Sequence, residues 1–293
     1  MVDQDVLLER RRRLGGELRR LREQAGLSGR DLAGLLGISQ SKVSRIESGA
    51  ALPAVPEVRS WASATKAADL DSEMLQMLAD AAYMEIRPWD DALRGQTHLQ
   101  DSIRELESGR SIELTYQPSV VPGLLQTAEY ARRVFTMFRP QLTDKEIPAA
   151  VKGRLARQDG LFDPDRRFEF LITEAALRLR IGPASVMAAQ LDRIGTLGTL
   201  ENVSIGLIPA AAWARTFVPH GFIIFESTDS EPEALVLAET VHANLTMSAA
   251  GHVDLYREHW FLLRESAVFE AGARDLLAVV SEDLRKLSAE EAQ

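Results

Sequence analysis

Within residues 29–48, a small residue, a glycine and an apolar residue follow one another at a spacing that restricts the fold more than any other feature of the chain. These residues are Ala33, Gly37 and Val43. A helix-turn-helix needs a small residue where its two helices cross, a glycine in the turn and an apolar residue that fixes the second helix. Ile46 adds an apolar contact on the inner side of that second helix. The spacing therefore predicts a helix-turn-helix.

The second helix of this pattern begins after Ser39, ends before Gly49 and carries a polar outer face. That face consists of four residues with Lys42 beside them: Gln40, Ser41, Ser44 and Arg45. Polar side chains of this kind reach base edges and phosphates in a major groove. The alternative is a helical hairpin used only for packing, and the polar outer face favours DNA reading over it.

The net charge of −9 is unevenly distributed along the chain. Residues 10–45 hold 10 Lys and Arg against 3 Asp and Glu, although the chain as a whole is acidic. A basic patch on an acidic chain predicts that one part meets a polyanion. The run of arginines at 10–13, which includes Arg12 and Arg13, has two interpretations. It is either an additional phosphate or minor-groove arm, or the solvated start of the first helix.

The hydrophobic pattern predicts a mainly α N-terminal domain of five helices followed by an α+β C-terminal domain. We place the N-terminal domain at residues 1–86, a helical connector at 87–110 and the α+β domain at 111–293. Strands are expected at residues 112–116, 168–173, 203–208, 221–226 and 234–241. Helices of the second domain are expected from Thr127 to about Phe138, after the capping box at residues 143–146, at 184–197 and over roughly 256–287.

Residues 27–49 resemble the helix-turn-helix of the Xre family, the phage-repressor type of regulator. Gly29 and Arg30 depart from this pattern, because many relatives have a glutamine there that supports the recognition helix. The resemblance implies that Gln40, Ser41 and Ser44 face the bases. It implies that Arg30, Lys42 and Arg45 contact phosphates, which set the register of a protein on DNA rather than its sequence preference.

The second half of the chain resembles a C-terminal domain found in actinobacterial Xre regulators. The residues that carry this resemblance lie at 116–132, 170–178, 190–191 and 203–209. The family is described as antitoxin-like transcriptional regulators, often encoded beside a small acidic partner protein. In the segment that begins at Tyr116, Pro118 and Pro122 restrict the backbone and Gly123 permits a sharp turn, so we expect a rigid connector. Glu174 and Arg178 either line a polar regulatory pocket or form an ion-pair group.

Composition narrows the remaining functions. The chain has no cysteine, which excludes disulfides, thiolate catalysis and every cysteine-based metal site. No apolar run reaches the ~18 residues of a membrane span, and the acidic N-terminus lacks the order of a signal peptide, so a cytoplasmic protein is expected. The histidines include no His-x-x-x-His pair of the kind that binds zinc. His252 and His259 are seven residues apart and would share a helix face if one helix contained both, but we expect Gly251 to lie in a loop before His252. We therefore expect no metal, no cofactor and no enzyme.

Two function classes remain. The first is a sequence-specific regulator of transcription that binds double-stranded DNA at an inverted-repeat operator. Its C-terminal domain would form a homodimer and bind a small acidic protein, and the protein would associate with the nucleoid when on DNA. The homodimer is expected because regulators of this kind gain affinity by pairing two half-sites about one helical turn, ~34 Å, apart. The alternative is a ligand-responsive repressor with a small-molecule pocket in the C-terminal domain.

Overall fold

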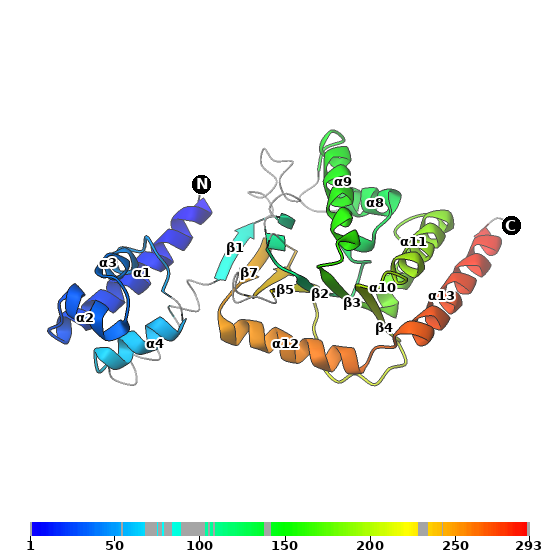
Figure 1. Cartoon of the computed structure of the whole chain (residues 1–293). Helices are drawn as coiled ribbons and strands as arrows, with labels where there is room; N and C mark the ends of the chain where they lie inside the picture. Colours follow the sequence, from blue (N-terminus) through cyan, green and yellow to red (C-terminus); the bar gives the residue numbers. More distant parts are fainter. Residues whose placement is uncertain are drawn as a thin grey trace. The chain divides into compact units, whose positions relative to one another are not determined.

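The computed structural model divides the chain into two compact units. One comprises Met1–Ile86 with Thr246–Gly251, and the other comprises Arg87–Leu245 with His252–Gln293. The structure describes residues 2–53, 55–67, 75, 78, 84–88, 103–104, 106–107, 109–137, 142–227, 234–241 and 243–291. Figure 1 labels the helices and most of the strands.

The first unit is helical, as predicted. Its helices are α1 (Val2–Gln24), α2 (Gly29–Leu36), α3 (Gln40–Glu47) and α4 (Val55–Ala64). Ser28 starts α2 with a reciprocal capping box to Asp31, and the Ser39 hydroxyl accepts a hydrogen bond from the Lys42 amide to start α3. Gly37 ends α2 in the left-handed conformation (φ 68°), which a side chain would disfavour. The turn predicted from sequence is therefore confirmed.

The core of the first unit is formed by the inner faces of these helices. Its buried residues include Leu14, Leu18 and Leu21 of α1, Leu32 and Ala33 of α2, Val43 and Ile46 of α3, and Val58 and Trp61 of α4. The indole Nε1 of Trp61 donates a hydrogen bond to the carbonyl of Leu18 (3.0 Å), which satisfies the only polar atom of a fully buried side chain. The fifth predicted helix, from Asp71, lies outside the described residues except for Leu75 and Leu78.

The second unit is built on a mixed sheet with the strand order β1-β7-β6-β5-β2-β3-β4, and the division of the chain into units falls within β1 and β7. The strands are β1 (Met84–Pro88), β2 (Ile112–Gln117), β3 (Arg167–Thr173), β4 (Val203–Ile208), β5 (Phe222–Glu226), β6 (Leu235–Glu239) and β7 (Ala243–Met247). β2, β3 and β4 are parallel, whereas β5 pairs antiparallel with both β2 and β6. The parallel pairs require crossover connections, and helices supply them.

Helices cover both faces of this sheet. The crossovers contain α8 (Ala128–Met137), α9 (Glu146–Arg157), α10 (Glu174–Arg178) and α11 (Ala184–Leu197), with short 3-10 turns η1 (Gly123–Leu125) and η2 (Gln158–Phe162). α11 lies beside the C-terminal helix α13 (Glu270–Glu291), and both pack on the face of β3 and β4 that carries Phe168 and Phe170 (Figure 1). On the opposite face, Phe222 of β5 contacts Tyr256 and Trp260 of α12 (Ala250–Glu265).

The predicted α+β fold class is confirmed, but three details differ. β1 and β7 were not predicted. Residues 87 and 88, assigned by sequence to a helical connector, belong to β1. Gly251 lies inside α12 instead of a loop, so His252 and His259 share one helix. The turn expected at Gly123 is the 3-10 turn at Gly123–Leu125, and Gly123 enters it without the left-handed conformation.

Candidate nucleic-acid interface

The predicted recognition helix α3 presents the polar face that the sequence indicated. Gln40, Ser41, Ser44 and Arg45 are exposed, whereas Val43 and Ile46 are buried at 1% exposure on the opposite side. Ala33 of α2 is buried at the crossing of the two helices. The apolar residues hold α3 in place while the polar residues remain in solvent, which is the arrangement that readout in a major groove requires.

Close backbone contact also fixes the C-terminal end of α3 against α1. A Cβ atom on Gly15 would lie 2.3 Å from the carbonyl oxygen of Ile46 and 2.8 Å from that of Glu47. A Cβ atom on Gly49 would lie 2.9 Å from the amide nitrogen of Arg12. Two glycines therefore permit α1 and the end of α3 to approach more closely than side chains would allow.

A half-buried ion pair reinforces the same contact. Arg22 of α1 donates to both carboxylate oxygens of Glu47, from Nε at 2.6 Å and Nη2 at 3.1 Å, and its Nη1 donates to the carbonyl of Leu27. Both charged side chains are only 11% exposed, so this bidentate pair is shielded from solvent. The pair raises the pKa of Arg22, chiefly through its hydrogen bond to Glu47.

The roles of Gly15, Arg22 and Glu47 were not predicted from the sequence. A glycine pair inside a helical pattern was the available signal for Gly15, because a glycine there usually has a packing reason. No local pattern signals the partner of Arg22, which lies 25 residues away.

The predicted phosphate-contacting residues fall into two groups. Arg12, Arg13, Arg30 and Arg45 are exposed, and among the described residues none of their side chains forms a hydrogen bond or ion pair. Lys42 differs, because its Nζ lies 2.6 Å from Oε1 of Glu57 in α4. The Lys42 side chain is 37% exposed, so it reaches solvent while its charge is partly compensated.

Gly29, where the Xre pattern has a supporting glutamine, lies beside Gln40. The Nε2 atom of Gln40 is 3.7 Å from the position a Cβ atom would take on Gly29. The absent side chain therefore leaves room that Gln40, the first residue of α3, partly covers.

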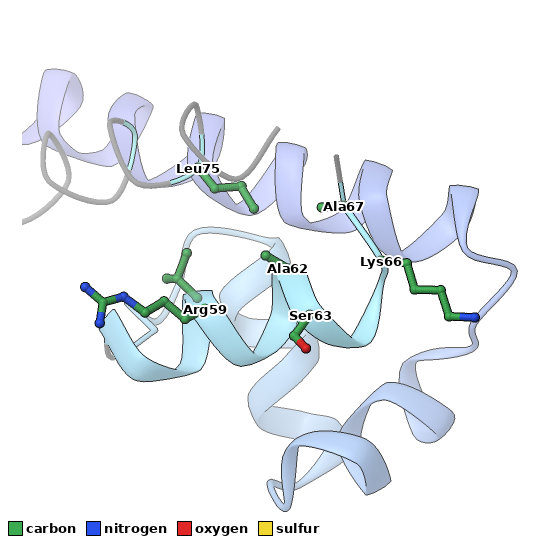
Figure 2. Close-up of a pocket in the computed structure, with 7 residues that line it drawn as sticks. Arg59, Ala62, Ser63, Lys66, Ala67 and Leu75 are labelled. Atoms are coloured by element: carbon green, nitrogen blue, oxygen red, sulfur yellow. The ribbon is translucent and has the colours of Figure 1, made fainter. Parts of the chain in front are cut away.

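A depression of about 290 Å³ lies on the first unit, along α4. Val58, Ala62, Ala67 and Leu75 form its apolar part, and Figure 2 shows Arg59 and Lys66 extending away from it in opposite directions. The two cations therefore do not converge on a common ligand position.

Glu174 and Arg178, the candidate regulatory pocket, form an ion-pair group. Arg178 pairs with Glu174 at 2.6 Å and with Asp283 of α13 at 2.9 Å, and Glu174 also accepts a hydrogen bond from the Ala210 amide. These contacts lower the pKa of Glu174, chiefly through the Ala210 amide. The adjacent depression measures about 60 Å³.

Within the part of the chain that the structure describes, no three His, Asp or Glu side chains are grouped so as to hold a metal ion. His259 instead shares a hydrogen bond with Thr216 at 2.7 Å. None of the described helices is long and apolar enough to cross a membrane.

Comparison with known proteins gives two family matches. A model described as "Domain of unknown function (DUF5753)" matches residues 100–279, and one described as "Helix-turn-helix domain" matches residues 13–74. No curated protein matches the chain. Similar solved structures include that of TrmBL2, described as an archaeal chromatin protein with a novel mode of DNA binding. That chain is 11% identical, the match covers 83% of this chain and 87% of that one, and the TM-score is 0.30. At this TM-score the likeness supports no further statement about this chain.

Proposed function

The chain belongs to the family described as domain of unknown function DUF5753, and we propose that it is a sequence-specific DNA-binding regulator of transcription of the Xre type. The exposed polar face of α3 carries this proposal. That face stands on a helix-turn-helix whose apolar contacts, caps and Arg22–Glu47 ion pair fix its position. An αα-hairpin used only for packing has no need of four polar side chains in solvent on such a rigidly held helix.

The contact scheme follows from exposure and side-chain chemistry. Gln40, Ser41 and Ser44 would read base edges, since amide and hydroxyl groups form hydrogen bonds with the donors and acceptors of the major groove. Arg45 and Arg30 would contact phosphates, and Arg12 and Arg13 would extend the contact along the backbone. Lys42 would contact a phosphate while its Nζ remains paired with Glu57, so its positive charge would be partly neutralised.

The finer parts of the proposal concern the C-terminal unit. We assign it dimerisation on an inverted-repeat operator and the binding of a small acidic protein, in the manner of an antitoxin-like regulator. Large exposed apolar side chains support an interaction role, since Trp213 is 87% and Phe217 is 82% exposed. Such a regulator would work on the nucleoid, in the cytoplasm.

Selection of genomic DNA fragments by the purified protein at ~150 mM salt tests the proposal, because non-specific binding weakens steeply with salt. We expect enrichment of a discrete inverted repeat and footprint protection of both half-sites. The variant Gln40→Ala/Ser44→Ala should lose the enriched sequence. Arg274→Ala provides a control, because it removes one exposed arginine from α13 in the other unit. Enrichment of no sequence by the wild-type protein would reject sequence-specific reading by α3 alone.

The alternative of a ligand-responsive repressor with an apolar pocket is less well supported. In the described part of the second unit, the depressions beside Arg178 and Glu113 measure about 60 Å³ and 50 Å³. These volumes are far below the ~300 Å³ or more of a typical drug-sized ligand site. Four charged side chains, however, line the second of them.

A further inference from the structure

A small polar cavity lies inside the second unit, between the sheet, η1 and α9. Glu113 and Thr115 of β2 face it from the sheet, Gly123 and Leu124 from η1, and Arg154 and Arg157 from α9. Its volume is about 50 Å³. Glu239 at the end of β6 also lines it and is exposed, so the cavity reaches solvent there.

Two residues that line this cavity each carry a buried side-chain atom with no hydrogen-bond partner among the described residues. The two atoms are Oε2 of Glu113, whose residue is only 2% exposed, and Nε of Arg154. Buried polar atoms are nearly always paired with protein, water or ligand, so each unpaired atom requires an explanation. One is an acceptor when ionised and the other is a cationic donor, which makes the pair complementary to a molecule carrying both charges.

The surrounding groups leave both atoms available. Oε1 of Glu113 already accepts a hydrogen bond from Thr115, and the nearest cation to Oε2 is Nη2 of Arg166 at 3.7 Å, too far for a hydrogen bond. Arg157 is held by Glu107 through two hydrogen bonds to Oε1, at 3.0 Å and 2.6 Å. The acidic and basic side chains around the cavity thus balance in number, so a ligand with no net charge disturbs this balance least.

Arg154 is positioned by the Pro122–Gly123 segment. Its Nη1 donates to Oε1 of Gln126 at 2.8 Å, and a Cβ atom on Gly123 would lie 3.4 Å from its Nε. The glycine therefore allows the guanidinium to lie against η1. Gln126 in turn donates to the carbonyl of Val121 at 2.7 Å. This rigid segment thus has a role in holding a cation beside the cavity.

We propose that this cavity binds a small zwitterion of the size of glycine or alanine, with its ammonium on Glu113 and its carboxylate on Arg154. The volume of about 50 Å³ is several times the roughly 10–15 Å³ that a cavity needs to hold one water molecule, so the cavity admits a small molecule. Free glycine and alanine have five and six non-hydrogen atoms. A guanidinium is well suited to a carboxylate, and a buried carboxylate is stabilised by an ammonium. That this cavity is the effector site of a regulator rests on the proposed function. The binding of the zwitterion itself does not depend on that function.

The ionisation of Glu113 provides a specific readout. Burial, and secondarily the charge of Glu107, raises the pKa of Glu113 from 4.5 to about 7. The charged groups that face it are Glu107, Arg157 and Arg166. Without a ligand Glu113 is therefore partly protonated near pH 7. An ammonium ligand favours the carboxylate, so binding at that pH should release less than one proton per ligand.

Isothermal titration calorimetry on the full chain tests the proposal with glycine and L-alanine up to ~20 mM, in two buffers of different ionisation enthalpy. We expect saturable heat, proton release in the stated amount, and a rise in Tm of about 3–6 °C at tenfold the Kd. Glu113→Gln should weaken binding at least tenfold and abolish proton release. Arg154→Gln should also weaken it tenfold, and Arg274→Ala should leave it unchanged. Circular dichroism and Tm without ligand establish that each variant is folded.

Acetate, methylammonium and L-phenylalanine serve as controls, because each lacks one charge or exceeds the volume. Absence of saturable heat with both glycine and alanine would overturn the proposal and leave ordered water as the occupant. Equal binding of acetate would overturn the zwitterion, equal binding of phenylalanine would overturn the size limit, and unchanged binding in Glu113→Gln would place the ligand elsewhere. Calorimetry requires no DNA, so failure of DNA binding and failure of this proposal are separate results.

Discussion

The contact between α1 and the end of α3 can be tested by adding a single methyl group. In Gly15→Ala, the new Cβ atom would lie 2.3 Å from the carbonyl oxygen of Ile46. Carbon and oxygen atoms in van der Waals contact are separated by roughly 3.5 Å, so α1 and α3 must move apart by about 1 Å. The atoms on the opposing side are backbone, which cannot rotate away as a flexible side chain can.

Gly16→Ala provides a matched control on the same helix. A Cβ atom on Gly16 would meet nothing within 4 Å. Both substitutions replace glycine by alanine inside α1, and each gains the same helix propensity of about 1 kcal/mol. The difference in free energy of unfolding between the two variants therefore isolates the clash, which overpacking data place at about 1–3 kcal/mol.

Hydrogen–deuterium exchange of peptides covering residues 40–48 measures this free-energy difference in α3 itself. If the free energy of local opening falls by the same about 1–3 kcal/mol, exchange should be about 5- to 140-fold faster in Gly15→Ala than in Gly16→Ala. DNA affinity for the selected site should fall in Gly15→Ala alone, because α3 is displaced from its support. Equal exchange in the two variants would refute the close contact between α1 and α3.

The remaining predictions concern the charges and polar groups of the two units. Gln40→Ala should lose about 1–3 kcal/mol of discrimination between operator and mismatched DNA, measured by fluorescence anisotropy. An unchanged sequence preference would show that residues other than Gln40 read the bases. Arg45→Ala should weaken binding to all sequences and reduce the salt slope by about 1, whereas a loss confined to the operator would contradict a phosphate contact. Glu57→Gln should release Lys42 and strengthen DNA binding, with a steeper salt slope; no change would show that Lys42 contacts no phosphate. Glu113 has a raised pKa in the folded chain, so stability should fall as pH rises from about 4.5 to about 7 and then level off. Glu113→Gln should remove that component of the pH dependence in urea unfolding, and an unaltered profile would assign it to other groups.

The sequence by itself determined the helix-turn-helix and its polar face. Ser28, Gly37 and Ser39 act on backbone groups within a few residues, so their capping roles follow from local chemistry. The local residue pattern similarly predicted strands at 112–116, 168–173 and 203–208, which the structure places at 112–117, 167–173 and 203–208, because side chains alternate between the two faces of a strand. The residues proposed to contact DNA could be named because the local periodicity of the helix separates its exposed face from its buried face.

Only the tertiary structure decided which charges are already paired and which spaces are closed. Glu57 of α4 forms an ion pair with Lys42 of α3. The carbonyl oxygen of Ile46 leaves no room for a side chain at position 15. The cavity beside Glu113 requires β2, η1 and α9 together, and the three come from separate parts of the sequence. A local pattern records the period and ends of an element, whereas such contacts depend on how distant elements pack, and no spacing within one element specifies that.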